Sequence, residues 1–315
     1  MEKLVTVIIL SYRNTLGLYP TLESVLEQTY EKIEIIFSDD GSPEFDKEMP
    51  GLKSFISGHQ KGNITNVIYN ALPENVGTVR NINSAIKLSS GHYIKILSAD
   101  DRLSHPNVLS AYVNFMKMYN SKIVFAKMRG VTLDGQYKYK LQSCDFNYKR
   151  LRNYTVGQTR NRLFRRNFLP APAWMIDAEV FRTHGLFLES TRLIEDYPYW
   201  LYLTSKGVAF HYMDEIAIDY KLSGISSSGH YSEAFMNDML VIYDNYIFPY
   251  DKRFGILQSV YNALKRAGLN YYIAEAKNDK MTRVKYFPFW FLVSAQGMVN
   301  GMANKFISLQ KKEYH

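Results

Sequence analysis

The stretch Y-I-K-I-L-S-A-D-D-R, residues 93–102, decides the fold of this chain. Its first half combines aromatic, β-branched and aliphatic side chains after Gly91, a pattern typical of a short buried strand. Two acids, Asp100 and Asp101, follow directly, and side chains at the carboxyl ends of strands line the ligand crevice of open α/β sheets. Adjacent carboxylates repel each other, so this position favours Mg²⁺ or Mn²⁺ held jointly with phosphate groups. A solvated turn that caps the next helix is the alternative interpretation.

Earlier apolar runs predict further strands of the same sheet. We expect strands at residues 4–10, 33–37 and 67–69, and helices from about Pro20 and at residues 79–88. A polar stretch without an expected element separates the second strand from the third, and each strand ends in a polar turn. This order predicts an α/β sheet whose site lies at the carboxyl ends of its strands.

The composition limits the classes of protein and of partner. The 315 residues allow one large domain or a domain with an appendage, and 46% apolar with 22% charged residues argues against a disordered chain. The net charge of +8 leaves nucleic acid, anionic lipid and a phosphorylated substrate open as partners. A single cysteine, Cys144, fits a reducing cytoplasm, and no run predicts a signal peptide or a membrane-spanning helix.

Two nucleotide-binding motifs are absent from the sequence. No G-x-G-x-x-G follows the first expected strand, and no G-x-x-x-x-G-K-S/T occurs anywhere. A dinucleotide-dependent dehydrogenase and a P-loop ATPase are therefore poorly supported as functions.

Four segments, in order, resemble one enzyme family. They are V-T-V-I-I-L-S-Y-R-N from Val5, I-E-I-I-F-S-D-D-G-S from Ile33, E-N-V-G-T-V-R-N-I-N-S-A-I from Glu74 and L-S-A-D-D-R from Leu97. Together they make this part of the chain similar to the nucleotide-sugar-binding half of family 2 glycosyltransferases with the GT-A fold. The resemblance implies a GT-A domain at residues 1–230, with a donor half at 1–101 and an acceptor half at 102–230. A helical C-terminal region follows at residues 231–315.

The resemblance implies a nucleotide site at the ends of the first strands. In similar enzymes the acid that matches Asp39 accepts the N3–H of uracil, and the arginine that matches Arg80 lies near the same base. Tyr12, after Ser11 at the end of the first strand, offers an aromatic face to that base, and Gly77 allows close approach of the backbone. Turn chemistry for Asp39 and core packing for Tyr12 are the structural alternatives.

The metal motif departs from that of the family. Asp101 matches the acid that binds Mn²⁺ or Mg²⁺ in similar enzymes, and Asp100 matches a residue beside the donor ribose or phosphates. Ser98 replaces the first acid of the motif, and Ser223 stands where many relatives have a histidine that joins the metal. These two serines leave the strength of metal binding open.

A second acidic pair predicts the catalytic base. Glu195 and Asp196 open an expected helix after Gly185, and in similar inverting enzymes the acid that matches Asp196 is the base. We expect Glu195 to contact the acceptor or a phosphate. The chemistry needs one, because an acceptor hydroxyl must lose its proton as it attacks the anomeric carbon. Favourable charge at a helix N-terminus is the alternative interpretation of this pair.

The acceptor half contains a basic segment. We expect a helix at 105–118 and strands at 123–126 and 208–212. Residues 149–166 contain seven basic residues and no acid. A loop over the donor diphosphate or a phosphorylated lipid, with Arg162 and Arg165 as contacts, competes with an anionic membrane contact and a solvated face. No nucleic-acid-binding module accompanies the segment, which disfavours nucleic acid as the partner. Trp174 either faces the acceptor sugar or belongs to the core.

The C-terminal region predicts helices at residues 232–248, 252–267 and 270–310, separated at Pro249, Gly268 and Pro288. The last has one apolar stripe, at Phe291, Ala295, Met298, Met302, Phe306 and Leu309, with basic residues before and after it. Such a helix either lies on an anionic bilayer at the inner membrane face or packs on protein, including a second copy of the chain.

These observations predict a glycosyltransferase. The expected reaction is inverting transfer of a sugar from a UDP-sugar to a saccharide or lipid-linked acceptor, in surface polysaccharide or glycolipid assembly. The Gln-x-x-Arg-Trp motif of processive synthases is absent, so we expect a non-processive enzyme. A polyprenyl-phosphate sugar synthase and a catalytically impaired nucleotide-binding relative are the alternatives.

Overall fold

The computed structural model describes residues 2–132, 137–138, 153–169, 171–222, 232–250 and 255–294. The chain divides into two compact units, Met1–Ser228 and Gly229–His315. The first unit contains a sheet with helices, and the described part of the second is helical. Within the described ranges no helix is long and apolar enough to cross a membrane.

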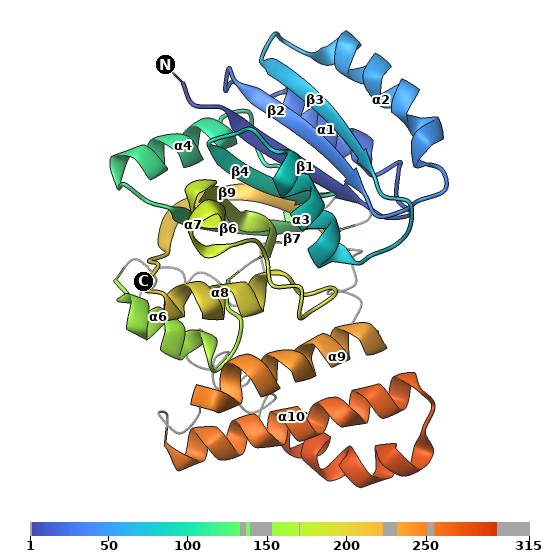
Figure 1. Ribbon diagram of the computed structural model, residues 1–315, viewed down its shortest axis with the longest axis vertical. Coiled ribbons are helices and arrows are strands. Elements are labelled where there is room, and N and C mark those ends of the chain that lie inside the picture. The colour runs from blue at the N-terminus through green and yellow to red at the C-terminus, as the bar shows by residue number, and fades with distance from the viewer. Residues whose placement is uncertain are drawn as a thin grey trace, which may run out of the picture. The chain divides into compact units, whose positions relative to one another are not determined.

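One mixed sheet forms the centre of the first unit (Figure 1). Its strands are β1 (Val5–Ser11), β2 (Ile33–Asp39), β3 (Ile64–Ala71), β4 (Tyr93–Ser98), β5 (Arg102–Leu103), β6 (Ile123–Val131), β7 (Tyr137–Lys138), β8 (Trp174–Asp177) and β9 (His211–Lys221). They lie in the order β3-β2-β1-β4-β8-β6-β9-β5, and β7 pairs with β6. The first four strands of this order are parallel neighbours, whereas β8 is antiparallel to β4 and β6.

The parallel register brings the carboxyl ends of three strands together. Ser11 at the end of β1 lies opposite Asp39 of β2, and Leu10 lies opposite Ser98 of β4. Every residue of β1 and β2 is buried, as expected for parallel strands that are covered on both faces. The strands predicted at residues 4–10, 33–37 and 67–69 are therefore confirmed, together with the α/β class.

Helices cover both faces of this parallel part. The helices α1 (Leu18–Leu26), α2 (Phe45–His59) and α4 (Val108–Met118) share one apolar core with the odd-numbered residues of β1. The helix α3 (Thr78–Leu88) packs against β1 and β2 and buries Val79, Ile82 and Ile86 (Figure 1). The strands β1, β2 and β4 are thereby buried between two layers of helix, which leaves their carboxyl ends as the edge on which polar side chains gather.

The later part of the first unit adds shorter elements around a cluster of aromatic rings. These are α6 (Val156–Leu163), the 3₁₀ turn η1 (Ala171–Ala173), α7 (Glu179–His184) and α8 (Asp196–Ser205). Trp174 of β8 and Trp200 of α8 are both almost fully buried, with ring centroids 5.8 Å apart in an edge-to-face arrangement. Aromatic pairs of this geometry are favourable beyond the area that they bury. The cluster fixes α8 against β8.

Two expectations for the first unit were wrong. Residues 45–59 form α2 although Pro50 lies inside it, because Phe45, Leu52 and Ile56 bury one face of the helix. The strand expected at 208–212 starts instead at His211 and continues to Lys221. The charged residues of this strand are typical of a loop, but several of them form ion pairs with residues of neighbouring segments. These ion pairs are Lys127–Asp214, His105–Glu215 and Arg129–Asp219.

The second unit consists of α9 (Glu233–Ile242), the π-helical turn η2 (Tyr243–Ile247), α10 (Ile256–Ala276) and a helix at residues 280–294. The breaks expected at Gly268 and Pro288 were wrong, because both residues lie inside helices. A Cβ at Gly268 would lie 3.6 Å from the Cα atom of Trp290, so this glycine allows the two helices to approach closely. The chain turns at 277–279 instead, where Asn278 has a φ of 57°. Most of the apolar stripe expected in the last helix lies outside the described residues.

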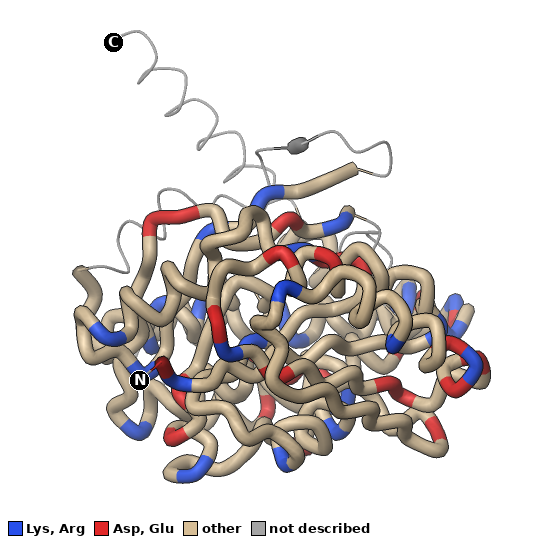
Figure 2. The backbone as a smooth tube through the Cα atoms, turned by 90° about the horizontal axis from the view of Figure 1, so that it is seen from above, with Lys and Arg blue, Asp and Glu red and all other residues tan. Residues whose placement is uncertain are grey.

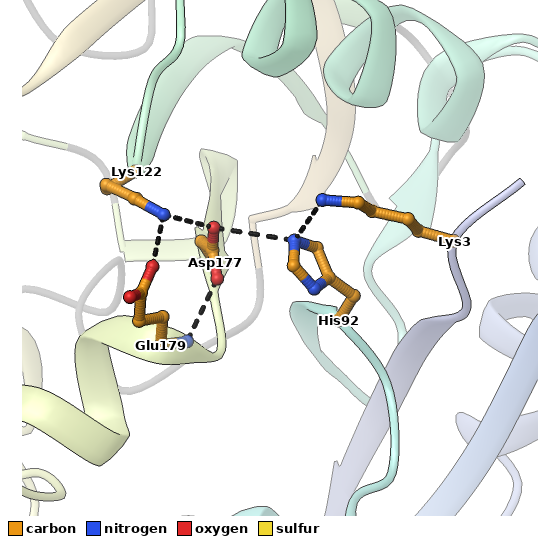
Figure 3. Close-up of polar contacts among 5 residues, drawn as sticks. All are labelled: Lys3, His92, Lys122, Asp177 and Glu179. Carbon is orange, nitrogen blue, oxygen red and sulfur yellow. Dashed lines mark hydrogen bonds and ion pairs between the residues drawn. The ribbon is translucent and has the colours of Figure 1, made fainter.

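Lys and Arg are interspersed with Asp and Glu along the described backbone (Figure 2). One charged cluster lies at the start of β4 and the end of β8, at the opposite end of β4 from its two acids (Figure 3). Asp177 accepts from Lys122 at 2.9 Å and lies 3.5 Å from His92, and Lys122 also pairs with Glu179. Burial acts to raise the pKa of Asp177, but bonds from Lys122 and from the amide of Glu179 outweigh it and lower the pKa.

Replacing Lys122 with Met should therefore destabilise the first unit by about 1 kcal/mol at pH 7, since the lysine is partly exposed. A lowered carboxyl pKa contributes stability above the pKa of the unfolded chain, and this contribution is lost as the pH falls through the folded pKa. The deficit should therefore shrink between pH 5 and pH 3, measured by urea unfolding. Lys117→Met, at an exposed lysine in the last turn of α4, is the control and should change stability little at either pH. A deficit that is constant with pH would contradict the assignment to Asp177.

Candidate active site

The end of β2 is joined to the end of β1 through Asp39. The hydroxyl of Ser11 donates to Asp39 Oδ2 at 2.5 Å, and Ser42 donates to both carboxylate oxygens through its amide and its hydroxyl. The amide of Arg13 in turn donates to the Ser42 hydroxyl at 2.6 Å. Asp39 is only 1% exposed, so much of its hydrogen-bonding capacity holds these two turns together. The structure thus brings the predicted residues Ser11 and Asp39 into direct contact.

The next acid, Asp40, holds the loop that precedes α3. Its carboxylate accepts the amides of Val76 at 2.8 Å and Gly77 at 3.0 Å. Gly77 has a φ of 93°, and a Cβ on it would lie 2.4 Å from Cγ of Arg192. The close approach that requires glycine at this position is therefore an approach to Arg192 of the acceptor half. The amide of Val79 also donates to the carbonyl of Arg192, at 3.1 Å.

Tyr12 and Arg80, the two residues predicted to lie near the nucleotide base, are accessible to solvent. Tyr12 is 42% exposed, with the guanidinium of Arg13 at 5.3 Å from its ring centroid, so the core alternative for Tyr12 is wrong. Arg80 is exposed on α3 and pairs with Glu189 at 3.3 Å. Both side chains are free of the apolar core, and nothing buried would have to move for either to reorient.

Asp100 has both of its oxygens engaged. Asn14 donates to one oxygen at 2.7 Å and the ammonium of Lys221, from the end of β9, donates to the other at 2.9 Å. Asp100 adopts a φ of 83°, a conformation that costs free energy in a non-glycine residue and is found mainly at functional sites. Its amide donates to the carbonyl of Gly17, which helps to hold this backbone. A cation of the protein therefore already lies beside the first of the two acids.

Asp101 is buried and has fewer partners. The amide of Lys221 donates to its Oδ1 at 3.3 Å, and the side chain is only 4% exposed. Burial raises the pKa of Asp101 to about 7. Lys95 on β4 is completely buried, which lowers the pKa of its ammonium to about 7, and its charge favours ionisation of Asp101. The ammonium donates to the carbonyls of Ile96 and Pro172.

No group of three His, Cys, Asp or Glu side chains in the described residues could hold a metal by itself. Asp101 fits as a single carboxylate ligand of a cation that is otherwise held by donor phosphates, as Mg²⁺ commonly is. Position 223, where many relatives have a histidine, lies outside the described residues.

The second acidic pair lies at the N-terminus of α8. The amide side chain of Asn167 donates to Asp196 Oδ2 at 2.8 Å, and the amide of Tyr197 donates to Oδ1. Burial raises the pKa of both carboxyls in the pair, and for Glu195 the charge of Asp196 raises it further. Only Asp196 has the bond from Asn167, which favours its charged form. We therefore assign the ionised member of the pair to Asp196 and the protonated member to Glu195.

One segment of chain contacts both acidic sites. Asn167 bonds to Asp196, and five residues later the carbonyl of Pro172 accepts from Lys95, which interacts with Asp101. The segment continues into η1 and β8. Asn167, Lys95 and Lys221 were not expected from the sequence.

Three of the predicted acceptor contacts, Trp174, Arg162 and Arg165, differ in their exposure to solvent. Trp174 is 1% exposed inside the aromatic cluster and offers no surface to a sugar, so the core interpretation is correct for this residue. The described part of the basic segment contains α6 rather than only a loop, with a capping box between Thr155 and Gln158. Within and after this helix Arg162 is partly buried and Arg165 is exposed. The helix packs on α8, and the hydroxyl of Tyr197 donates to the carbonyl of Leu163 at 2.6 Å.

Sequence comparison gives one family match and several relatives. The model of the family described as glycosyl transferase family 2 matches residues 6–185. An uncharacterized glycosyltransferase of Rickettsia bellii is 28% identical over 204 residues, which are 65% of this chain and 27% of the relative. This chain thus spans less than a third of that relative's length. The putative teichuronic acid biosynthesis glycosyltransferase TuaG of Bacillus subtilis is 25% identical over 234 residues, which are 73% of this chain and 83% of TuaG.

Solved structures show the same fold. The structure of S. aureus TarS 1–349 in complex with UDP-GlcNAc has a TM-score of 0.57 and 17% identity, and covers 87% of this chain and 72% of its own. The mannosyltransferase PcManGT from Pyrobaculum calidifontis, in complex with GDP-Man and Mn²⁺, has a TM-score of 0.56 and 15% identity. This match covers 97% of this chain and 87% of PcManGT. These likenesses confirm the expected GT-A fold.

Gly77→Ala should destabilise the first unit by about 2–4 kcal/mol, because it adds a contact with Arg192 to the cost of a positive φ. Gly207→Ala is the matched control, since Gly207 has a φ of 83° and nothing within 4 Å of an added Cβ. It should cost only about 1 kcal/mol, the part due to backbone conformation. Urea unfolding of both variants measures the difference. Equal losses in the two variants would contradict the role given to Arg192.

Proposed function

The chain belongs to glycosyl transferase family 2, and we propose that it transfers one sugar from a UDP-sugar to a saccharide or lipid-linked acceptor with inversion. The setting in this proposal is the assembly of a surface polysaccharide or glycolipid at the inner face of a membrane. TuaG, a relative by sequence, is named for teichuronic acid biosynthesis. We assign the reaction to residues 1–230 and a separate role to residues 231–315.

The observation that carries the proposal is the arrangement of two buried acids around one segment of chain. Asp101 lies at the carboxyl end of β4, and Asp196 lies at the start of α8. The segment from Asn167 to Ala173 contacts Asp196 at one end and, through Lys95, the site of Asp101 at the other. A donor site beside one acid and a proton acceptor at the other are the two parts that sugar transfer requires.

Asp196 supplies the base in this mechanism. The attacking hydroxyl of the acceptor transfers its proton to the carboxylate of Asp196 while its oxygen attacks the anomeric carbon from the side opposite the leaving diphosphate. One such displacement inverts the anomeric centre. Burial raises the pKa of Asp196, which brings its basicity closer to neutral pH, and the bond from Asn167 orients the carboxylate.

The donor site lies at the ends of β1, β2 and β4. Tyr12 offers an exposed ring for the nucleotide base. Asp39 would accept a hydrogen bond from the edge of that base, with the acceptor capacity that Ser11 and Ser42 leave free. The complexes of TarS with UDP-GlcNAc and of PcManGT with GDP-Man are consistent with a nucleotide sugar but differ in the base. We propose uracil from the resemblance of the motif around Asp39.

Two positive groups would act on the diphosphate. Asp101 would hold Mn²⁺ or Mg²⁺ together with the donor phosphates, and such a cation stabilises the charge of the leaving diphosphate. Lys221 lies beside Asp100 and supplies a second, permanent positive charge from the protein. The structure is therefore compatible with donor binding that depends only in part on the metal, in keeping with the loss of the acid at position 98.

Asp196→Asn should lower kcat by about 10²–10⁴-fold and leave the affinity for UDP unchanged, because the base is lost and the donor site is not. Asn167→Ala should shift the acidic limb of the kcat–pH profile to higher pH. It removes a bond that favours the charged form of Asp196, so the pKa rises and more alkaline solution is needed to ionise the base. Transfer of labelled sugar, measured between pH 5 and pH 9, tests both variants.

The control for Asn167→Ala is Asn66→Ala, which removes another amide-to-carboxylate bond, 3.1 Å from Asn66 to Glu34, on β3 and β2. Its pH profile should match that of the unmodified chain. If Asp196→Asn retains its rate within tenfold, the base assignment fails. A polyprenyl-phosphate acceptor would then be favoured, because a phosphate is already ionised and needs no base.

Calorimetric titration tests the donor site with UDP, GDP, dTDP and UMP, each with and without Mn²⁺. UDP should bind best, and Asp101→Ala should abolish the effect of Mn²⁺.

Lys221→Gln should weaken the binding of UDP about tenfold with or without Mn²⁺ and weaken the binding of UMP less, because the lysine acts on the diphosphate. Lys87→Gln, at an exposed lysine in the last turn of α3, is the control. Failure of every nucleoside diphosphate to bind under these conditions would exclude the proposed reaction. Binding of UDP without turnover of any UDP-sugar would favour an impaired relative.

A further inference from the structure

The helix at residues 280–294 in the second unit is apolar on two opposite sides. At about 100° per residue, five of its residues fall on one arc about 100° wide. They are Thr282, Tyr286, Phe289, Trp290 and Val293, and all are partly buried. This inner side packs on α10, where Tyr271 stacks on Trp290 with ring centroids 4.8 Å apart. Gly268 allows the backbones to approach at the same place.

The opposite side presents an apolar stripe to solvent. Its members are Met281, Val284, Phe287, Pro288, Phe291 and Leu292, which occupy an arc about 140° wide. Met281 is 86% exposed, Val284 75%, and Phe291 52%. A helix that is apolar on both sides is normally buried on both. A contiguous apolar surface of this kind marks a place of contact with another body.

The charge around the stripe identifies that body. On the helical wheel Arg283 borders one side of the stripe and Lys285 the other, and Lys280 lies at its first turn. Arg283 pairs with Glu275, whereas Lys280 and Lys285 form no ion pair with any described residue. Residues 280–294 contain three basic residues and no acid. The partner should therefore be both apolar and negatively charged.

We propose that this stripe binds the surface of an anionic lipid bilayer. The apolar side chains would enter the boundary between headgroups and acyl chains, and the flanking lysines would meet the lipid phosphates. The opposite side of the helix packs on α10, so only the stripe would face the lipid and the helix would lie in the membrane plane. The inference gives the proposed transferase a membrane partner and does not depend on its reaction.

A second copy of the chain fits the stripe less well. A two-fold contact through the stripe would bring together two surfaces that each carry Lys280 and Lys285, with no acid in 280–294 to neutralise them. Anionic lipid is the occupant that removes the apolar surface from water and neutralises the charge together.

Co-sedimentation of the full chain with lipid vesicles tests the proposal. Vesicles of phosphatidylcholine with about 30% phosphatidylglycerol should bind the chain, and pure phosphatidylcholine should bind it at least tenfold more weakly. Lys280→Gln with Lys285→Gln should weaken binding about 30-fold, or roughly fivefold for each lysine. Met281→Ser with Phe291→Ser should weaken it more than tenfold at the same ionic strength.

Met118→Ser is the control, because Met118 is 74% exposed on α4 of the first unit and should leave binding unchanged. Every variant alters exposed side chains, and circular dichroism with UDP titration checks that each unit is intact. Binding of UDP with no binding to either vesicle would overturn the membrane proposal and leave the transferase proposal standing. If instead the stripe variants convert a dimer to a monomer in light scattering, without any vesicle binding, a second copy covers the stripe and the proposal is wrong.

Discussion

The parallel register of β1 with β2 and β4 is the constraint on which the site depends. Because Ser11 lies opposite Asp39 and Leu10 opposite Ser98, three strands end at one edge of the sheet and deliver their polar turns to the same place. A slip of one residue would turn every side chain of a strand to the other face. The buried hydrogen bonds from Ser11 and Ser42 to Asp39 could then no longer form. The apolar core and the proposed donor site are thus specified by the same pairing.

Much of this edge was predictable from the sequence, since it is built from local patterns. A continuous apolar run predicts a strand buried on both faces, and the first polar residues after it must lie at its end. These patterns alone place Ser11, Asp39 and Asp100 at strand ends, and the GT-A resemblance agrees with that placement. Tyr12 is exposed for the same reason, because it is the first residue beyond β1.

Contacts between distant segments were not predictable in this way. Nothing local in the sequence indicates that Asn167 bonds to Asp196 or that Lys221 pairs with Asp100, because each contact depends on how separate elements pack. Local signals also misled where tertiary contacts outweighed them. Pro50 lies inside α2 because buried apolar side chains of that helix compensate for it. Asp214 and Asp219 lie inside β9 because ion pairs compensate for their charge.

The interior lysine of β4 shows why the acid at the strand end can be buried at all. Asp101 and Lys95 are each almost inaccessible to water, and each alone would be a costly charge in the core. Their mutual attraction reduces that cost, and the bond from Lys95 to the carbonyl of Pro172 draws the acceptor half into the same arrangement. Removing either charge would leave the other uncompensated. The strand that appears in the sequence as an apolar run with one lysine is therefore electrostatically coupled to the acids that follow it.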